Sequence, residues 1–243
     1  MELTEAVAGG EIEVWYQPQV EARSLRVAGF EALARWNHPS QGLLTPDAFV
    51  PAHGAAADAL AAFVLERACE EAARWPDVTV AVNMSPRHFA HRSFVDEVAQ
   101  AMARAGLAPE RLELEILETS AFEEPALAKA AMTRLRDMGV GIAIDDFGQG
   151  YSRQSLLLDL PVSKIKLAHA IVTDPASAGW IGDFVRTTHA LGMKVTAEGV
   201  ETQAQADAMT QAGCDYLQGY FFARPAPSAA ITAALNRTPD PRP

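Results

Sequence analysis

Short apolar runs alternate with longer Ala- and Leu-rich stretches along most of the chain, and this alternation constrains the fold most strongly. Runs such as VTVAV at 78–82 and GVGIAI at 139–144 are almost wholly apolar, which is typical of parallel strands buried on both faces. The stretches between them have helical periodicity, and several end at a glycine, as helices commonly do. The pattern predicts repeated βαβ units around a parallel sheet.

The expected elements number eight strands and five helices, which favours an α/β fold of the (β/α)8 TIM type, with a doubly wound open sheet as the alternative. The first two strands are joined by only EARSLR, too short for a helical crossover, so we expect an antiparallel first strand. The expected strands are Val14–Val20, Val27–Ala34, Val78–Met84, Leu112–Leu117, Gly141–Asp145, Lys164–Leu167, Lys194–Ala197 and Tyr216–Phe222. The expected helices are Ala56–Arg74, Ser93–Ala105, Pro125–Met138, Ala176–Leu191 and Ala204–Ala212.

The charge balance excludes several classes of function. With 31 acidic and 20 basic residues, the formal net charge is −11, which argues against a binder of nucleic-acid polymers and against a polybasic membrane anchor. No apolar run approaches the roughly 20 residues needed to span a bilayer, so we expect no membrane insertion. The acidic opening lacks a signal peptide, and two distant cysteines, Cys69 and Cys214, give no disulfide framework. We therefore expect a cytoplasmic protein.

Polar residues recur where the expected strands end. In a barrel of this type, the carboxyl ends of the strands gather at one mouth, which is the catalytic face. A single acidic residue at such a position is as well explained as the N-cap of the next helix, but acids interspersed with Asn, Lys and Gln at seven strands are not. The residues at these positions are Glu31, Arg35, Asn83, Glu115, Glu118, Asp145, Asp146, Lys166, Glu198 and Gln218.

The chemistry of this set favours a divalent metal centre. Carboxylates and an amide are hard oxygen ligands, which suit Mg²⁺ or Mn²⁺ better than structural zinc. The adjacent Asp145 and Asp146 can serve two ions. Carboxylates converging without a cation would repel one another and raise their pKa values. With Lys166 beside them, the set predicts metal-assisted hydrolysis of a phosphate ester.

The same residues lie in motifs that resemble those of the EAL-type cyclic di-GMP phosphodiesterases. The resemblance begins at YQPQV and FEALARW, which contains Glu31-Ala32-Leu33, and runs in the family's order and spacing from about Gln17 to Pro227. A bare Glu-Ala-Leu would carry no weight in so Ala- and Leu-rich a chain, whereas eight ordered motifs are specific. The further motifs are VNMSPRHF, LELEILE, IAIDDFGQGYS, LPVSKIK, VTAEGVET and CDYLQGYFFARP.

The resemblance implies a TIM-type barrel that hydrolyses cyclic di-GMP to linear 5′-pGpG with two Mg²⁺ or Mn²⁺ ions, Ca²⁺ being inhibitory. We expect one domain over 1–236 with a Pro-rich tail at 237–243, and, because the family commonly dimerises, a homodimer. The sequence leaves open whether sensory or GGDEF-type domains are fused to it in the full-length protein. The implied metal ligands are Glu31, Asn83, Glu115, Asp145 and Asp146. The implied substrate contacts are Gln17, Leu33, Arg35, Asn83 and Pro225.

The remaining implied roles concern the reacting water and the supports of the site. Glu198 matches the family's proposed general base or ligand to metal-bound water, and Lys166 matches the lysine that positions the water. Glu118 matches the glutamate that braces the loop after Asp146. Glu201 and Gln218 match residues that orient metal ligands.

Three departures from the family's pattern keep a second function open. Ala168 stands where the family usually has Asp, Gln149 where it usually has Thr, and His53-Gly54-Ala55 where it tends to have Ala-Glu-Glu. They fit either neutral drift on a working enzyme or a degenerate domain that binds cyclic di-GMP without cleaving it. Degenerate members typically lose metal ligands, and this chain retains them, which favours the enzyme. A domain that acts only through protein–protein contact is the third alternative.

Overall fold

The computed structural model describes residues 3–50, 54–118, 122, 124–148, 160–174 and 177–236. The strands are β1 Ile12–Glu21, β2 Val27–His38, β3 Gly42–Leu44, β4 Thr79–Asn83, β5 Leu112–Leu117, β6 Gly141–Phe147, β7 Lys164–Leu167, β8 Lys194–Ala197, β9 Tyr216–Gln218 and β10 Ala226–Pro227. The helices are α1 Leu3–Ala8, α2 Pro46–Phe49, α3 Ala55–Ala72, α4 Pro86–Ala90, α5 Phe94–Ala105, α6 Pro125–Met138, α8 His169–Thr173, α9 Ala178–Ala190, α10 Gln203–Ala212 and α11 Ser228–Leu235, with a 3-10 turn at Pro109–Arg111.

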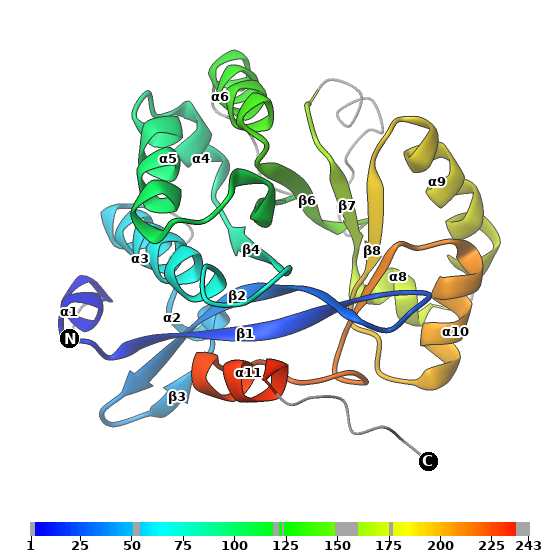
Figure 1. Ribbon diagram of the computed structural model, residues 1–243, viewed down its shortest axis with the longest axis horizontal. Helices are drawn as coiled ribbons and strands as arrows, with labels where there is room; N and C mark the ends of the chain where they lie inside the picture. The colour runs from blue at the N-terminus through cyan, green and yellow to red at the C-terminus, as the bar shows by residue number, and fades with distance from the viewer. Residues whose placement is uncertain are drawn as a thin grey trace.

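Eight of the described strands close into a barrel, which confirms the expected fold. Their order is β1-β9-β8-β7-β6-β5-β4-β2, and pairing of β1 with β2 completes the circle. β1 is antiparallel to both of its barrel neighbours, whereas the other pairs are parallel. Figure 1 shows the helices outside this sheet, with α3 to α6 on one side, α8 to α10 on the other, and α11 lying along β1. The parallel strands therefore present their carboxyl ends at one mouth.

The expected strands and helices are all present, but β1, β2 and β6 are longer than expected, and the short elements β3, β10, α1, α2, α4, α8 and α11 were not expected. The strands Leu112–Leu117, Lys164–Leu167 and Lys194–Ala197 are confirmed to the residue. The strand expected over Tyr216–Phe222 is wrong beyond Gln218, because the chain turns there. A Cβ at Gly219 would lie only 2.0 Å from the carbonyl oxygen of Val200, so this turn requires glycine. His53 and Gln149 lie outside the described residues, as does the tail at 237–243.

The hydrophobic core fills the layer between the barrel and its helices. Trp75 is almost fully buried, stacks edge-on against Tyr16 at 4.8 Å between ring centroids, and donates its indole N–H to Thr232 Oγ1 at 2.9 Å. It thereby ties the end of α3 to β1 and to α11. Cys69 and Cys214 are free and buried, as expected, and burial raises the pKa of each thiol to about 12. No described helix is long and apolar enough to cross a membrane.

The interior of the barrel, in contrast, is polar even below the mouth. Lys164 on β7 donates to Glu113 on β5 at 2.8 Å, and both side chains are only 10% exposed. Between these strands β6 contributes Gly141, where a Cβ would come within 3.3 Å of the Glu113 side chain. The glycine therefore makes room for an ion pair that spans two strands.

We expect Lys164→Met to lower the free energy of unfolding by about 3–5 kcal/mol, because it leaves Glu113 buried and unpaired. The double variant Glu113→Leu/Lys164→Met removes both charges and is expected to recover most of that loss. Urea unfolding followed by circular dichroism measures both. Arg67→Met breaks the exposed pair with Glu70 and, as the control, should cost less than about 1 kcal/mol. A Lys164→Met cost no larger than this control would contradict the assigned role of the pair.

Candidate active site

Four carboxylate side chains converge on the ammonium group of Lys166 at the barrel mouth. Its Nζ lies 2.8 Å from Glu115, 2.9 Å from Asp145, 2.8 Å from Glu198 and 3.7 Å from Glu31. Lys166 has no exposed side-chain surface. The carboxylates come from β2, β5 and β6 and from the residue after β8, so only a closed barrel brings them together. The structure thus gathers in one place the residues that the sequence pattern put at separate strand ends.

The charges in this cluster strongly perturb one another. Burial alone would lower the pKa of Lys166, but Asp145, Glu115 and Glu198 outweigh it and raise that pKa well above its usual value. Burial raises the pKa of Glu115 and of Glu198 well above the usual range, and Lys166 offsets this only in part. The positive charge of one ammonium group therefore does not balance the negative charge of the carboxylates around it.

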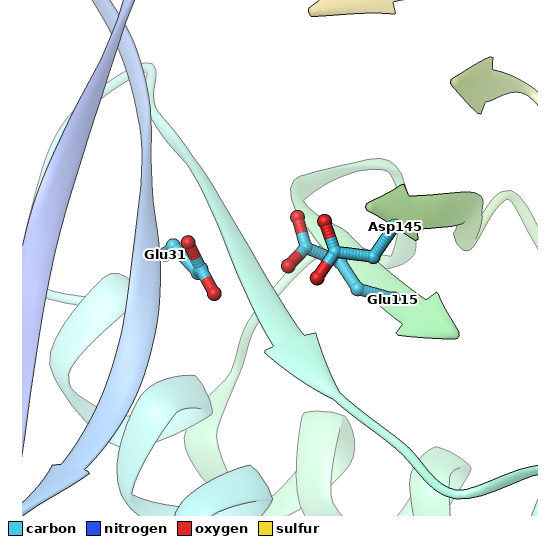
Figure 2. A group of neighbouring side chains, drawn as sticks. All are labelled: Glu31, Glu115 and Asp145. Carbon is cyan, nitrogen blue, oxygen red and sulfur yellow. The ribbon is translucent and has the colours of Figure 1, made fainter. Parts of the chain in front are cut away.

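Three of these carboxylates form a group that could hold a metal ion. Glu31, Glu115 and Asp145 are buried and offer oxygen atoms that all lie within 4.8 Å of one another. Figure 2 shows their carboxylates approaching one another from three strands. Glu115 Oε1 is buried and has no hydrogen-bond partner among the described residues, although buried carboxylate oxygens are normally paired. An all-oxygen donor set with an unpaired oxygen fits a hard divalent cation.

A hydrogen-bonded amide network holds Glu31 in this position. Asn83 Nδ2 donates to Glu31 Oε1 at 2.7 Å, and Gln218 Nε2 donates to Glu31 Oε2 at 2.6 Å. Gln218 Nε2 also lies 3.3 Å from Gln17 Oε1, and Gln17 Nε2 donates to the carbonyl oxygen of Ala223 at 3.3 Å. Both oxygens of Glu31 are therefore oriented by neutral donors, which leaves its charge available to a cation.

The segment that follows β6 has an unusual backbone. Asp146 has a φ of +55°, a left-handed conformation that is uncommon for residues other than glycine. Burial and the neighbouring charge of Asp145 raise the pKa of Asp146. The amide N–H of Gly148 donates to Glu118 Oε2 at 2.8 Å. Glu118 therefore contacts the segment that follows Asp146. The positive φ of Asp146 interrupts the extended backbone of β6, whose pairing with β7 shifts in register between Ile144 and Phe147.

A cavity of about 360 Å³ opens above the cluster. Of the expected substrate contacts, Gln17 and Leu33 line it, together with Glu31, Asp146, Glu198, Glu201 and Gln218. Asn83, Arg35 and Pro225 do not line it. Arg35 is buried, donates to the carbonyl oxygen of Ala34 at 2.8 Å and lies 5.7 Å from the ring of Trp15. Two of the five expected substrate contacts therefore line the cavity, and the other three lie outside its wall.

Four further residues line the cavity and were not predicted as site residues: His169, Gly199, Gly219 and Tyr220. His169 approaches the carbonyl oxygen of Gly199 with Nδ1 at 3.0 Å; since a carbonyl only accepts, Nδ1 carries the proton. Tyr220 is 52% exposed, and the Arg224 guanidinium lies 4.2 Å from its ring centroid. The aromatic residue in LQGYFFARP is the only sequence signal for Tyr220, and nothing in the sequence pattern singles out His169.

A larger cavity, of about 410 Å³, lies outside the barrel beside α3 and α5. Its wall includes His88, Asp58, Phe94 and the ion pair between Arg104 and Glu66. It does not contain the residues of the buried carboxylate cluster. We therefore place the candidate active site at the barrel mouth, where the cavity is smaller but lies next to the carboxylate cluster.

The fold and the cluster define a barrel protein with a candidate divalent metal centre at the carboxyl ends of its strands. The chain belongs to the EAL domain family, whose model matches residues 1–225.

Similar proteins and a similar solved structure support this family assignment. The chain is 36% identical to the bifunctional diguanylate cyclase/cyclic di-GMP phosphodiesterase MucR of Pseudomonas aeruginosa, over 96% of this chain and 36% of that protein. It is 38% identical to the cyclic di-GMP phosphodiesterase NbdA of the same organism, over 97% of this chain and 31% of that protein. The chain thus spans about a third of the length of these relatives. The solved structure of the MucR phosphodiesterase in complex with c-di-GMP is 37% identical, covers 94% of this chain and 97% of that one, and has a TM-score of 0.85.

If the carboxylate group binds a cation, metal should stabilise the fold. Mg²⁺ or Mn²⁺ at a hundredfold excess over its Kd is expected to add about 2.7 kcal/mol to the free energy of unfolding and to raise the Tm by several degrees. Glu115→Gln, which retains the shape and removes a charge, should abolish most of this rise. Thermal unfolding with and without metal measures it, and Glu97→Gln on α5 is the matched control. An equal Tm rise in Glu115→Gln and wild type would contradict the assigned site.

Proposed function

We propose that this chain hydrolyses cyclic di-GMP to linear 5′-pGpG with the help of two divalent cations, Mg²⁺ or Mn²⁺. The observation that supports this most directly is the cluster of carboxylates around Lys166 beneath the cavity. With Asp146, five carboxylates face one ammonium group, an excess of four negative charges that two divalent cations would balance. Two relatives are named as cyclic di-GMP phosphodiesterases, and they indicate the class of substrate.

The residues available to the metals are those with oxygen atoms at the mouth. Glu31, Asn83, Glu115 and Asp145 would hold one ion, and Asp145 with Asp146 would hold the second. When bound, these cations would polarise the phosphodiester and lower the pKa of the attacking water. Calcium, which prefers more ligands at longer distances, is expected to inhibit.

The reaction requires a base, an attacking water and a leaving oxygen. The water oxygen forms a bond to one phosphorus, and the bond from that phosphorus to the ribose O3′ breaks, which leaves a 5′-phosphate and a 3′-hydroxyl. Glu198 lines the cavity and lies 2.8 Å from Lys166 Nζ; in the proposal it accepts the proton of the water, which Lys166 positions. The leaving O3′ takes up the proton that Glu198 accepted from the water, so protons and charges balance.

The other residues of the site orient substrate and ligands. Gln17 and Leu33 line the cavity and are placed to contact the nucleotide. Asn83, Arg35 and Pro225 would join them only after a rearrangement that brings them to the cavity. Three residues act as supports of the site. Gln218 does so through its hydrogen bond to Glu31, Glu118 accepts a hydrogen bond from the Gly148 amide, and Glu201 is the third.

The setting of the domain is part of the same proposal. Because the chain covers only 36% and 31% of MucR and NbdA, we expect a longer protein with sensory or GGDEF-type domains. We expect it to act in the cytoplasm, where cyclic di-GMP is the partner, and to form a homodimer.

A cyclic di-GMP receptor without turnover is the second candidate function. The observation that favours it is Ala168, which is buried directly after β7 where the family usually has Asp. One carboxylate fewer next to Lys166 would weaken positioning of the water rather than binding of the nucleotide.

Incubation with cyclic di-GMP and Mg²⁺ or Mn²⁺, followed by chromatography, is expected to yield pGpG, and a chelator should abolish the product. Glu198→Gln should lower kcat by a factor of about 10²–10⁴, because it removes the proton acceptor, while nucleotide binding persists. Glu66→Gln, an exposed carboxylate outside the barrel, is the matched control. Retained cyclic nucleotide with measurable binding in the wild type would favour the receptor, and a full rate in Glu198→Gln would exclude that residue as the base.

A further inference from the structure

Two buried amide atoms inside the barrel have no hydrogen-bond partner among the residues that the structure describes. They are Gln19 Nε2, a donor on β1, and Gln218 Oε1, an acceptor on β9. Both side chains are almost completely buried, and buried amides normally satisfy their hydrogen-bonding groups. A donor and an acceptor thus remain unpaired in the same polar interior.

The strand register places these two residues opposite each other. Gln19 is the direct partner of Gln218 in the antiparallel pair β1–β9, so both side chains lie on the same face of the sheet. On the other side of β1, Gln19 pairs with Gly29, where a Cβ would come within 2.2 Å of Thr79 Oγ1. Because Gly29 has no side chain, Gln218 is the only one of the two cross-strand partners of Gln19 that has one.

The orientation of the Gln218 amide is set by its other neighbours. Its Nε2 donates to Glu31 Oε2 at 2.6 Å and lies 3.3 Å from Gln17 Oε1. A flipped amide would direct its oxygen at the Glu31 carboxylate, where two acceptors would repel. The carbonyl oxygen of Gln218 must therefore face away from Glu31.

We infer that Gln19 is a positioning residue for the metal site, acting through Gln218 on Glu31. Gln19 Nε2 donates to Gln218 Oε1, directly after a small side-chain rotation or through one internal water. This contact satisfies both unpaired atoms and locks the Gln218 amide in the orientation that holds the Glu31 carboxylate. The inference rests on the proposed function only in taking Glu31 as a metal ligand.

The consequence is a contribution to metal affinity from a residue one layer below the site. Groups that orient a ligand typically change metal affinity by about 10–100-fold when they are removed. Without Gln19, the Gln218 amide can reorient and Glu31 loses its 2.6 Å donor. Asn83 Nδ2 still donates to Glu31 Oε1, so the site should be weakened rather than destroyed.

The test is a Mn²⁺ titration of the full chain without nucleotide, in which electron paramagnetic resonance measures free Mn²⁺. Gln19→Met, similar in volume but without polar groups, should raise the Kd for Mn²⁺ about tenfold. Gln218→Met should raise it at least as much. The double variant should be no weaker than Gln218→Met alone, because two residues acting through one contact are not additive. Gln203→Met on the exposed face of α10 is the control and should leave the Kd unchanged.

The outcomes separate this inference from the proposed function. A Gln19→Met Kd within twofold of wild type, or additive effects in the double variant, overturns the inference and leaves the metal site intact. Absence of Mn²⁺ binding by the wild type overturns both. Should Gln19→Met fail to fold, Gln19→Leu repeats the measurement with the same expectations.

Discussion

The arrangement of the mouth depends on one fully buried lysine ammonium that lies between carboxylates from four other parts of the barrel. Lys166 has no exposed side-chain surface and three carboxylates within 2.9 Å. A lone buried ammonium would be costly, and so would the clustered carboxylates, so each needs the other for the fold to be stable. Because the partners come from β2, β5, β6 and the end of β8, the requirement can be met only when the barrel is closed.

The same cluster changes how the acidity of the chain should be understood. A net charge of −11 is unfavourable for binding a nucleotide with two phosphates, and at the mouth four carboxylates surround one ammonium group. Burial raises the pKa values of Glu115 and Glu198, and repulsion from the neighbouring carboxylates adds to this effect, which Lys166 offsets only in part. Divalent cations would relieve that repulsion and at the same time provide the positive charge for the phosphates.

Much of this could be predicted from sequence, because apolar runs mark buried parallel strands and the residue after each run lies at the mouth. Leu112–Leu117 was predicted to the residue for this reason. The extension of the last strand to Phe222 failed because the aromatic residues suggest a strand, whereas Gly219 packs against the backbone of Val200. His169 was missed because its place in the cavity depends on its contact with Gly199, which no local pattern encodes. The absence of Arg35 from the cavity wall is likewise a tertiary property.

The reversed first strand determines which chemistry faces Glu31. In a parallel strand only the carboxyl end reaches the mouth, whereas the antiparallel β1 brings its middle there, with Gln17 directly opposite Glu31. Opposed residues on one face have their Cβ atoms about 4.5–5.5 Å apart, so an acid at position 17 would repel Glu31. Amides at Gln17 and Gln19 avoid that repulsion and supply hydrogen bonds instead. The strand that closes the barrel therefore adds no charge to a site that already has an excess, and it orients the carboxylate on which a cation would depend.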